Sequence, residues 1–191
     1  LWDNYSITHF GDCRQKQPLS AFTLTGKNGT GAGLTATYTH RNDSNQVYLR
    51  QQESVIQYGF LPDLKKIPAA FPMQKGKVTW EGFITSDTAG EHKFYFSGSG
   101  YTKFWLDGKL LLDKWREGWN PGPSNFKHSL EKGKPCAIRL EWIPESTQAF
   151  ASLQWLSPTP PSLQNKICLS SEAAENLDYY FIAGKNTDEI I

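Results

Sequence analysis

The amino-acid sequence predicts an all-β protein, an antiparallel β-sandwich. Apolar and polar residues alternate along much of the chain, for example at Leu34, Ala36 and Tyr38, and a period of two is typical of strands that bury one face. Gly and Pro turns separate these short runs, and no stretch shows the apolar repeat of an amphipathic helix. Asp107-Gly108 between two apolar runs adds a strong signal for a two-residue hairpin turn.

The hairpin around Asp107 and Gly108 is expected to lie at the centre of the sandwich. Its turn requires positive φ at both positions, which Gly adopts freely and Asp more readily than most residues. The register pairs Leu106 with Lys109 and Trp105 with Leu110, and its continuation pairs Phe104 with Leu111. One side then carries Trp105, Leu110 and Leu112, and the other carries Phe104, Leu106 and Leu111. Since both sides are apolar, we expect both to be covered.

The remaining strands follow in chain order from the same alternation. They are expected within residues 34–38, 78–84, 92–96, 136–142 and 151–155, with a further strand at 177–182 and the start of a helix at 186–191. The residues predicted to be mostly buried are Trp80, Phe94, Phe96, Trp105, Leu110, Leu112, Ile138, Leu140, Leu153 and Trp155. His92 shares a face with two of these and is interpreted as a core histidine.

Composition excludes several classes of partner. The 191 residues carry a net charge of +1 without a stripe of Lys or Arg, which argues against nucleic-acid binding. No stretch approaches the ~18 apolar residues of a membrane helix, so no membrane partner is expected. The three cysteines are far apart, and none forms a zinc-ligand motif with another Cys or a His; they could include one disulfide or be buried thiols. We expect no cofactor and no metal, and a secreted or periplasmic location.

Catalysis is not expected from this chain. Glycoside hydrolysis requires two carboxylates held about 5 to 9.5 Å apart, and no such pair is evident in the sequence. Asp107 is explained by its turn, while Glu53, Glu81 and Glu141 are expected on the solvent side of strands. No Gly-x-Ser-x-Gly elbow is present to activate a serine.

Two resemblances together cover nearly the whole chain. The middle resembles the protective-antigen type domain of toxins, adhesins and glycosidases, in the segments 80–84, 89–96, 104–109 and 153–155. The ends, with Leu1-Trp2-Asp3-Asn4-Tyr5-Ser6 and Asp178-Tyr179-Tyr180-Phe181-Ile182, resemble the N-terminal β-sandwich of glycoside hydrolase family 31. The chain is therefore interpreted as a module inserted into an α-xylosidase or α-glucosidase whose catalytic aspartates lie beyond Ile191.

This resemblance sets three expected regions. Residues 1–32 are assigned to the host β-sandwich, residues 33–157 to the inserted module, and residues 158–191 to a Pro-rich linker and the returning host segment. Because an insertion leaves and re-enters its host at one place, we expect the two host segments to pair as strands. The resemblance also directs attention to a loop in which some lectin members hold calcium with two adjacent aspartates. That loop here is Ser97-Gly98-Ser99-Gly100, without a carboxylate, so calcium-dependent binding is not expected.

The best candidate for a binding site is the loop after the hairpin. Its predicted site residues are Trp115, Arg116, Trp119 and Asn120, with Tyr101 as a weaker companion. Tryptophan rings stack on the apolar faces of pyranoses, and planar polar groups bind pairs of hydroxyls. An alternative interpretation is that Trp115 simply covers the hairpin.

The sequence thus predicts a non-catalytic carbohydrate-recognition module that extends the substrate cleft of a family 31 enzyme. Its partners would be an oligosaccharide or polysaccharide and the remaining domains of the parent glycosidase. The alternative is a structural insertion that mediates domain packing or oligomerisation without touching sugar. A solvent-facing aromatic strip on the folded sandwich would distinguish these hypotheses.

Overall fold

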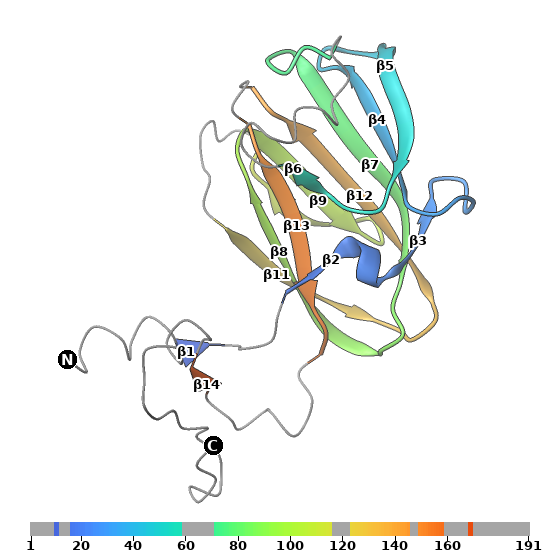
Figure 1. Ribbon diagram of the computed structural model, residues 1–191, viewed down its shortest axis with the longest axis vertical. Coiled ribbons are helices and arrows are strands. Elements are labelled where there is room, and N and C mark those ends of the chain that lie inside the picture. Colours follow the sequence, from blue (N-terminus) through green and yellow to red (C-terminus); the bar gives the residue numbers. More distant parts are fainter. Residues whose placement is uncertain are drawn as a thin grey trace, which may run out of the picture. The chain divides into compact units, whose positions relative to one another are not determined.

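The computed structural model describes residues 10–11, 16–58, 71–115, 123–145, 149–158 and 168–169. The chain divides into two compact units, which are Lys16–Pro158 and the two end segments Leu1–Gln15 and Thr159–Ile191. The larger unit is a sandwich of two antiparallel sheets (Figure 1), as the sequence predicts. Apart from the 3-10 turn η1 (Leu19–Ala21), the described residues form no helix, and therefore none that could span a membrane.

The larger sheet has seven strands. Its order is β10 (Lys109–Asp113), β9 (Tyr101–Leu106), β12 (Pro135–Ile143), β7 (Gly76–Thr85), β4 (Leu34–His40) and β5 (Asp43–Glu53), with β3 (Thr23–Gly26) also paired to β7. The smaller sheet has five strands. Its order is β11 (Ser124–Leu130), β8 (Gly90–Gly98), β13 (Ala151–Leu156) and β2 (Gln17–Pro18), with β6 (Gln57–Tyr58) also paired to β13.

The core lies between the two sheets and consists of the inward-facing half of each alternating strand. Seven of the ten residues predicted to be core are buried, namely Trp80, Phe94, Phe96, Ile138, Leu140, Leu153 and Trp155. Aromatic rings fill much of this space: the rings of Trp80 and Trp142 lie 6.3 Å apart, and the ring of Phe22 stacks on that of Trp155 at 3.9 Å. Outside the central hairpin, every residue predicted to be core is therefore buried.

The hairpin is where the core prediction is wrong. The turn itself forms as expected, with φ of 46° at Asp107 and 74° at Gly108. However, Phe104 and Leu106 are the fully buried apolar residues of β9, whereas Trp105 and Leu112 are half-buried and Leu110 is 45% exposed. A register shift between Leu110 and Leu112 also places Leu112, not Leu111, opposite Phe104. Because both sides of the hairpin are apolar, alternation alone could not identify the inward side.

The end segments pair with each other. β1 (Phe10–Gly11) and β14 (Cys168–Leu169) are antiparallel, with Phe10 opposite Leu169. The sandwich unit starts at Lys16, so the expected boundary at residue 33 falls inside it: β3 pairs with β7, and β2 with β13. The strand expected at 177–182 and the helix expected at 186–191 lie outside the described residues.

Candidate functional site

The outward-facing side of the seven-stranded sheet is the main candidate surface, and we call it the outer face. It is formed by alternate residues of five adjacent strands: Tyr101, Lys103 and Trp105 of β9, Arg139 and Glu141 of β12, Thr79, Glu81 and Phe83 of β7, Thr35 and Thr37 of β4, and Arg50 and Gln52 of β5. Two hollows of about 430 and about 470 Å³ lie on this face and share Lys27, Glu81 and Arg139.

One row of side chains crosses the outer face from strand to strand. Trp105 lies opposite Arg139, Arg139 opposite Glu81, and Glu81 opposite Thr35. The sequence produces this row because each of these residues alternates with a buried neighbour on its own strand, such as Leu140 beside Arg139. An aromatic ring, a guanidinium, a carboxylate and a hydroxyl are thus adjacent on one surface.

Arg139 is the electrostatic centre of this row. Its guanidinium carbon lies 5.3 Å from the centre of the Trp105 ring, and its Nη2 donates to Glu141. Its Nη1 is 3.8 Å from Glu81 Oε1, while Lys27 Nζ lies 2.8 Å from the other oxygen of Glu81. Since Arg139 is half exposed but the Glu141 side chain only 11%, the Glu141 carboxylate holds the guanidinium in place while leaving it open to solvent.

Two of the predicted site residues lie at the other end of β9. The rings of Tyr101 and Trp115 are 6.4 Å apart, and Lys103 Nζ lies 5.1 Å from the centre of the Trp115 ring. Tyr101, Lys103 and Trp105 therefore form an outward-facing stripe along β9, which ends at Trp115. The other predicted residues, Arg116, Trp119 and Asn120, lie outside the described residues.

Sequence reasoning missed the central part of this surface. It assigned Trp105 to the core, although it correctly expected Glu81 on the solvent side. A usable signal was present in β12, where Arg139 lies between the buried Ile138 and Leu140. Glu141 faces the same side but is buried, in contrast to the solvent position expected for it, because its carboxylate is covered where it bonds to Arg139. Once β9 and β12 pair, the strand neighbour of Arg139 must be outward-facing, and that neighbour is Trp105.

The loop associated with calcium in some lectins is used here for packing. Ser99 is buried, and its hydroxyl accepts a hydrogen bond from Phe150 N at 3.1 Å. Its carbonyl accepts from Trp142 Nε1 at 2.7 Å. Gly100 follows with φ of 78°, where an added Cβ would lie 2.0 Å from the carbonyl oxygen of Ile143. The oxygens of Ser99 are therefore committed to internal hydrogen bonds.

Two polar side chains that face the core have structural roles. His92 is fully buried, and its ring nitrogens contact the Gly90 carbonyl at 2.9 Å and the Ser86 hydroxyl at 3.0 Å, which confirms the core assignment. Burial lowers the pKa of His92, so the ring is neutral near pH 7. Glu53 faces inward, in contrast to the solvent position expected for it, and accepts hydrogen bonds from Tyr38, Tyr58 and Trp80.

A family comparison matches most of this chain. The model described as PA14 domain matches residues 31–164. A curated relative, the anti-sigma-I factor RsgI3 of Acetivibrio thermocellus, is 28% identical over 169 residues, which is 85% of this chain and 24% of that protein.

Two solved structures have folds similar to that of this chain. The GH31 α-xylosidase of Xanthomonas citri is 39% identical, with a TM-score of 0.70 over 85% of this chain and 18% of the enzyme. The epithelial adhesin 6 A domain of Candida glabrata, solved in complex with Galb1-3GlcNAc, is 12% identical, with a TM-score of 0.52 over 92% of this chain and 97% of the adhesin chain. The adhesin likeness concerns the fold alone. The chain thus spans less than a quarter of both the anti-sigma factor and the α-xylosidase.

Proposed function

Because this chain belongs to the PA14 domain family, we propose that it is a non-catalytic carbohydrate-recognition module. Its sugar-binding surface is the outer face of the seven-stranded sheet. The observation that carries the proposal is the row in which Arg139, held by Glu81 and Glu141, lies beside the half-buried ring of Trp105. This arrangement supplies an apolar platform and fixed hydrogen-bonding groups on one solvent-facing surface, which suits a pyranose.

The ligand we propose is an oligosaccharide or polysaccharide. Trp105 follows Tyr101 by four positions, and at about 3.3 Å per residue the stripe along β9 is about 13 Å long. A surface of this length accommodates several sugar units. Trp115 lies at its far end, and Arg116, Trp119 and Asn120, which follow in sequence, are proposed to extend the binding surface from there.

The parent protein is proposed to be a family 31 α-xylosidase or α-glucosidase. Support comes from the 39% identity to the α-xylosidase of Xanthomonas citri over 85% of this chain. The module would then extend the substrate cleft, the end segments would belong to the host, and the protein would be secreted or periplasmic, where long glycans are available. Sequencing the gene downstream of residue 191 tests this. A family 31 catalytic barrel there supports the proposal, and an unrelated domain contradicts it.

The second candidate is a structural insertion that packs against other domains or copies. The observation that favours it is Leu110, which is 45% exposed and lies opposite Trp105 on the neighbouring strand. Exposed apolar side chains next to an aromatic ring are common in protein interfaces as well as in sugar platforms. Sugar binding and self-association must therefore be measured on the same samples.

Titration calorimetry with xylo- and gluco-oligosaccharides tests the function. Arg139→Ala should weaken binding about tenfold or more, because a hydrogen bond to a charged group contributes about 1.5 to 3 kcal/mol. Arg41→Ala is the matched control, since Arg41 also pairs with a glutamate, Glu145 at 3.0 Å, but belongs to no part of the outer face. No binding by the unmodified chain to any glycan tested, or equal losses in both variants, would contradict the proposal. Self-association without sugar binding would favour the structural insertion.

A further inference from the structure

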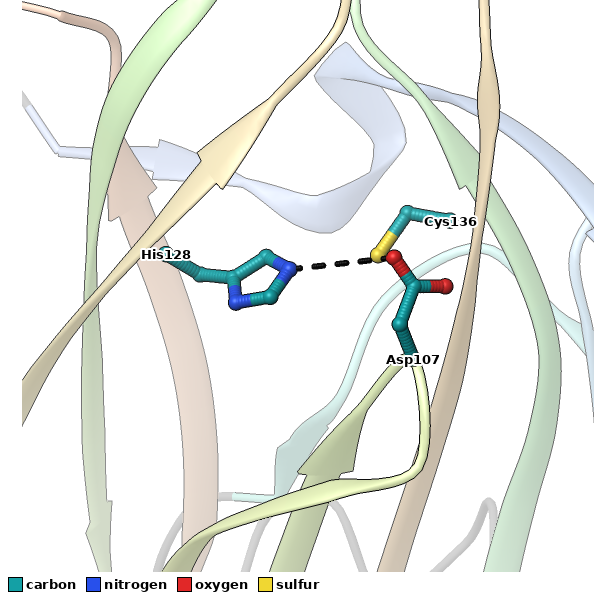
Figure 2. Close-up of side chains that lie close together, drawn as sticks. All are labelled: Asp107, His128 and Cys136. Atoms are coloured by element: carbon teal, nitrogen blue, oxygen red, sulfur yellow. Dashed lines mark ion pairs between the residues drawn. The ribbon is translucent and has the colours of Figure 1, made fainter.

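Three side chains that can ligate metals meet between the two sheets, away from the row on the outer face. Asp107 comes from the turn after β9, Cys136 from β12 of the same sheet, and His128 from β11 of the facing sheet. Their ligand atoms all lie within 4.8 Å of one another, and His128 Nε2 is 3.8 Å from Asp107 Oδ2. Figure 2 shows the His128 ring directed at the carboxylate and the thiol.

The backbone holds two of these groups in place. Asp107 N donates to the Ala137 carbonyl and Ala137 N donates to Asp107 Oδ1, both at 2.8 Å. These bonds tie the hairpin turn to the residue after Cys136 and leave Asp107 Oδ2 directed at His128. His128 lies opposite the buried His92 in the β8–β11 ladder, so its ring is also directed between the sheets. The cluster is thus built from three elements whose relative positions the sandwich determines.

We propose that Asp107, His128 and Cys136 bind a single zinc ion that links the two sheets. Sulfur, imidazole nitrogen and carboxylate oxygen are the ligand types of zinc sites. Tetrahedral zinc with bonds of about 2.0 to 2.3 Å holds its ligand atoms about 3.3 to 3.8 Å apart, so the three groups need only a small inward movement. A water molecule would complete the tetrahedron, and the 57% exposed side chain of Asp107 marks the route by which the ion enters.

Zinc must displace the proton of the Cys136 thiol in order to bind. Burial, followed by the charge of Asp107, raises the pKa of Cys136 to about 12, so the metal-free protein holds a thiol beside a carboxylate. Zinc binding replaces the thiol proton, which leaves to solvent, and the cation compensates the two negative charges. The competing explanation is an ion pair between protonated His128 and Asp107 without any metal, which requires no thiolate.

The test uses the full chain with Cys13 and Cys168 replaced by Ser, so that Cys136 is the one thiol left. After treatment with a chelator and a reductant, zinc binding is measured by calorimetry and cobalt(II) binding by absorption. We expect one ion per chain, a thiolate-to-cobalt charge-transfer band, and a melting temperature that rises with zinc. His128→Ala and Cys136→Ser should each weaken zinc binding at least about tenfold.

Two further variants keep the test decisive if a core substitution prevents folding. Asp107→Asn retains the oxygen that accepts from Ala137 N but removes the charged ligand, and it should weaken zinc binding. His40→Ala removes a histidine of β4 that is not part of the cluster, and it should bind zinc normally. No zinc binding, binding unaffected by His128→Ala and Asp107→Asn, or a cobalt complex without the thiolate band would overturn the proposal.

Discussion

Replacing Glu53 should destabilise the sandwich more than the loss of one surface charge would. Its Oε1 accepts from the Tyr38 hydroxyl at 2.6 Å and from Gln51 Nε2 at 2.7 Å, and its Oε2 accepts from Trp80 Nε1 at 2.7 Å and the Tyr58 hydroxyl at 3.0 Å. Tyr38 and Trp80 are fully buried. Glu53→Ala therefore removes the shared acceptor of several internal donors.

The expected loss in the free energy of unfolding depends on how many of these donors are left without an acceptor. The Trp80 indole loses its charged acceptor inside the core, and a buried donor without an acceptor costs about 1 to 3 kcal/mol. The Tyr38 hydroxyl also contacts the Tyr58 hydroxyl and can donate to it, so its loss is smaller. Adding the charge-assisted bonds, we expect Glu53→Ala to lower the free energy of unfolding by about 3 to 5 kcal/mol.

Urea unfolding followed by tryptophan fluorescence measures this change. Glu53→Gln keeps one acceptor oxygen and should fall between the parent chain and Glu53→Ala. Glu131→Ala is the control, because its carboxylate is 73% exposed and bonds only to Lys134 among the described contacts, so the free energy of unfolding should not change measurably. A loss below about 1 kcal/mol for Glu53→Ala, or equal losses for Glu53→Ala and Glu131→Ala, would refute the reasoning.

Two other predictions concern the core. Burial lowers the pKa of His92, so its neutral form stabilises the fold above about pH 6.5, the pKa of histidine in the unfolded chain. As the pH falls below about 6.5, the free energy of unfolding decreases by up to about 1.4 kcal/mol per pH unit. His92→Gln should reduce this slope in unfolding experiments at pH 7.5 and 5.5. Equal slopes for the parent chain and His92→Gln would contradict the assignment of His92 to the core. Phe104→Ala should cost about 3 to 5 kcal/mol, whereas Trp105→Ala should cost no more than about 2 kcal/mol. A larger loss for Trp105→Ala by thermal or urea unfolding would place Trp105 in the core after all.

Most of the fold could be predicted from local sequence patterns. The Asp107-Gly108 turn and the alternation in β7, β8, β12 and β13 depend on residues that are neighbours in sequence, so they could be read directly. The inward side of the hairpin could not be predicted, because both sides are apolar and the register shift after Leu110 has no local sequence signal. There the choice depends on the pairing of β9 with β12, which brings together residues more than thirty positions apart.

The candidate sites depend still more on tertiary contacts. Tyr101 and Trp115 were predicted as site residues from the composition of their segments, and the structure brings their rings to 6.4 Å of each other. The Asp107–His128–Cys136 cluster has no sequence motif, since its members are separated by whole strands and meet only when the two sheets pack. Spacing rules for zinc ligands apply to pairs of residues on one loop or helix, so they do not detect a site whose ligands come from separate strands.

The central claim is that sugar binds along β9 and Arg139 on the outer face. It is tested most directly by NMR, from the indole Nε1–H and backbone amide signals of the chain as an oligosaccharide is added. The account predicts shifts at Trp105, Trp115 and Arg139. The indole signals of Trp80 and Trp142, which bond internally to Glu53 and Ser99, should stay unchanged. Shifts confined to the five-stranded sheet, or none at saturating oligosaccharide, would contradict it.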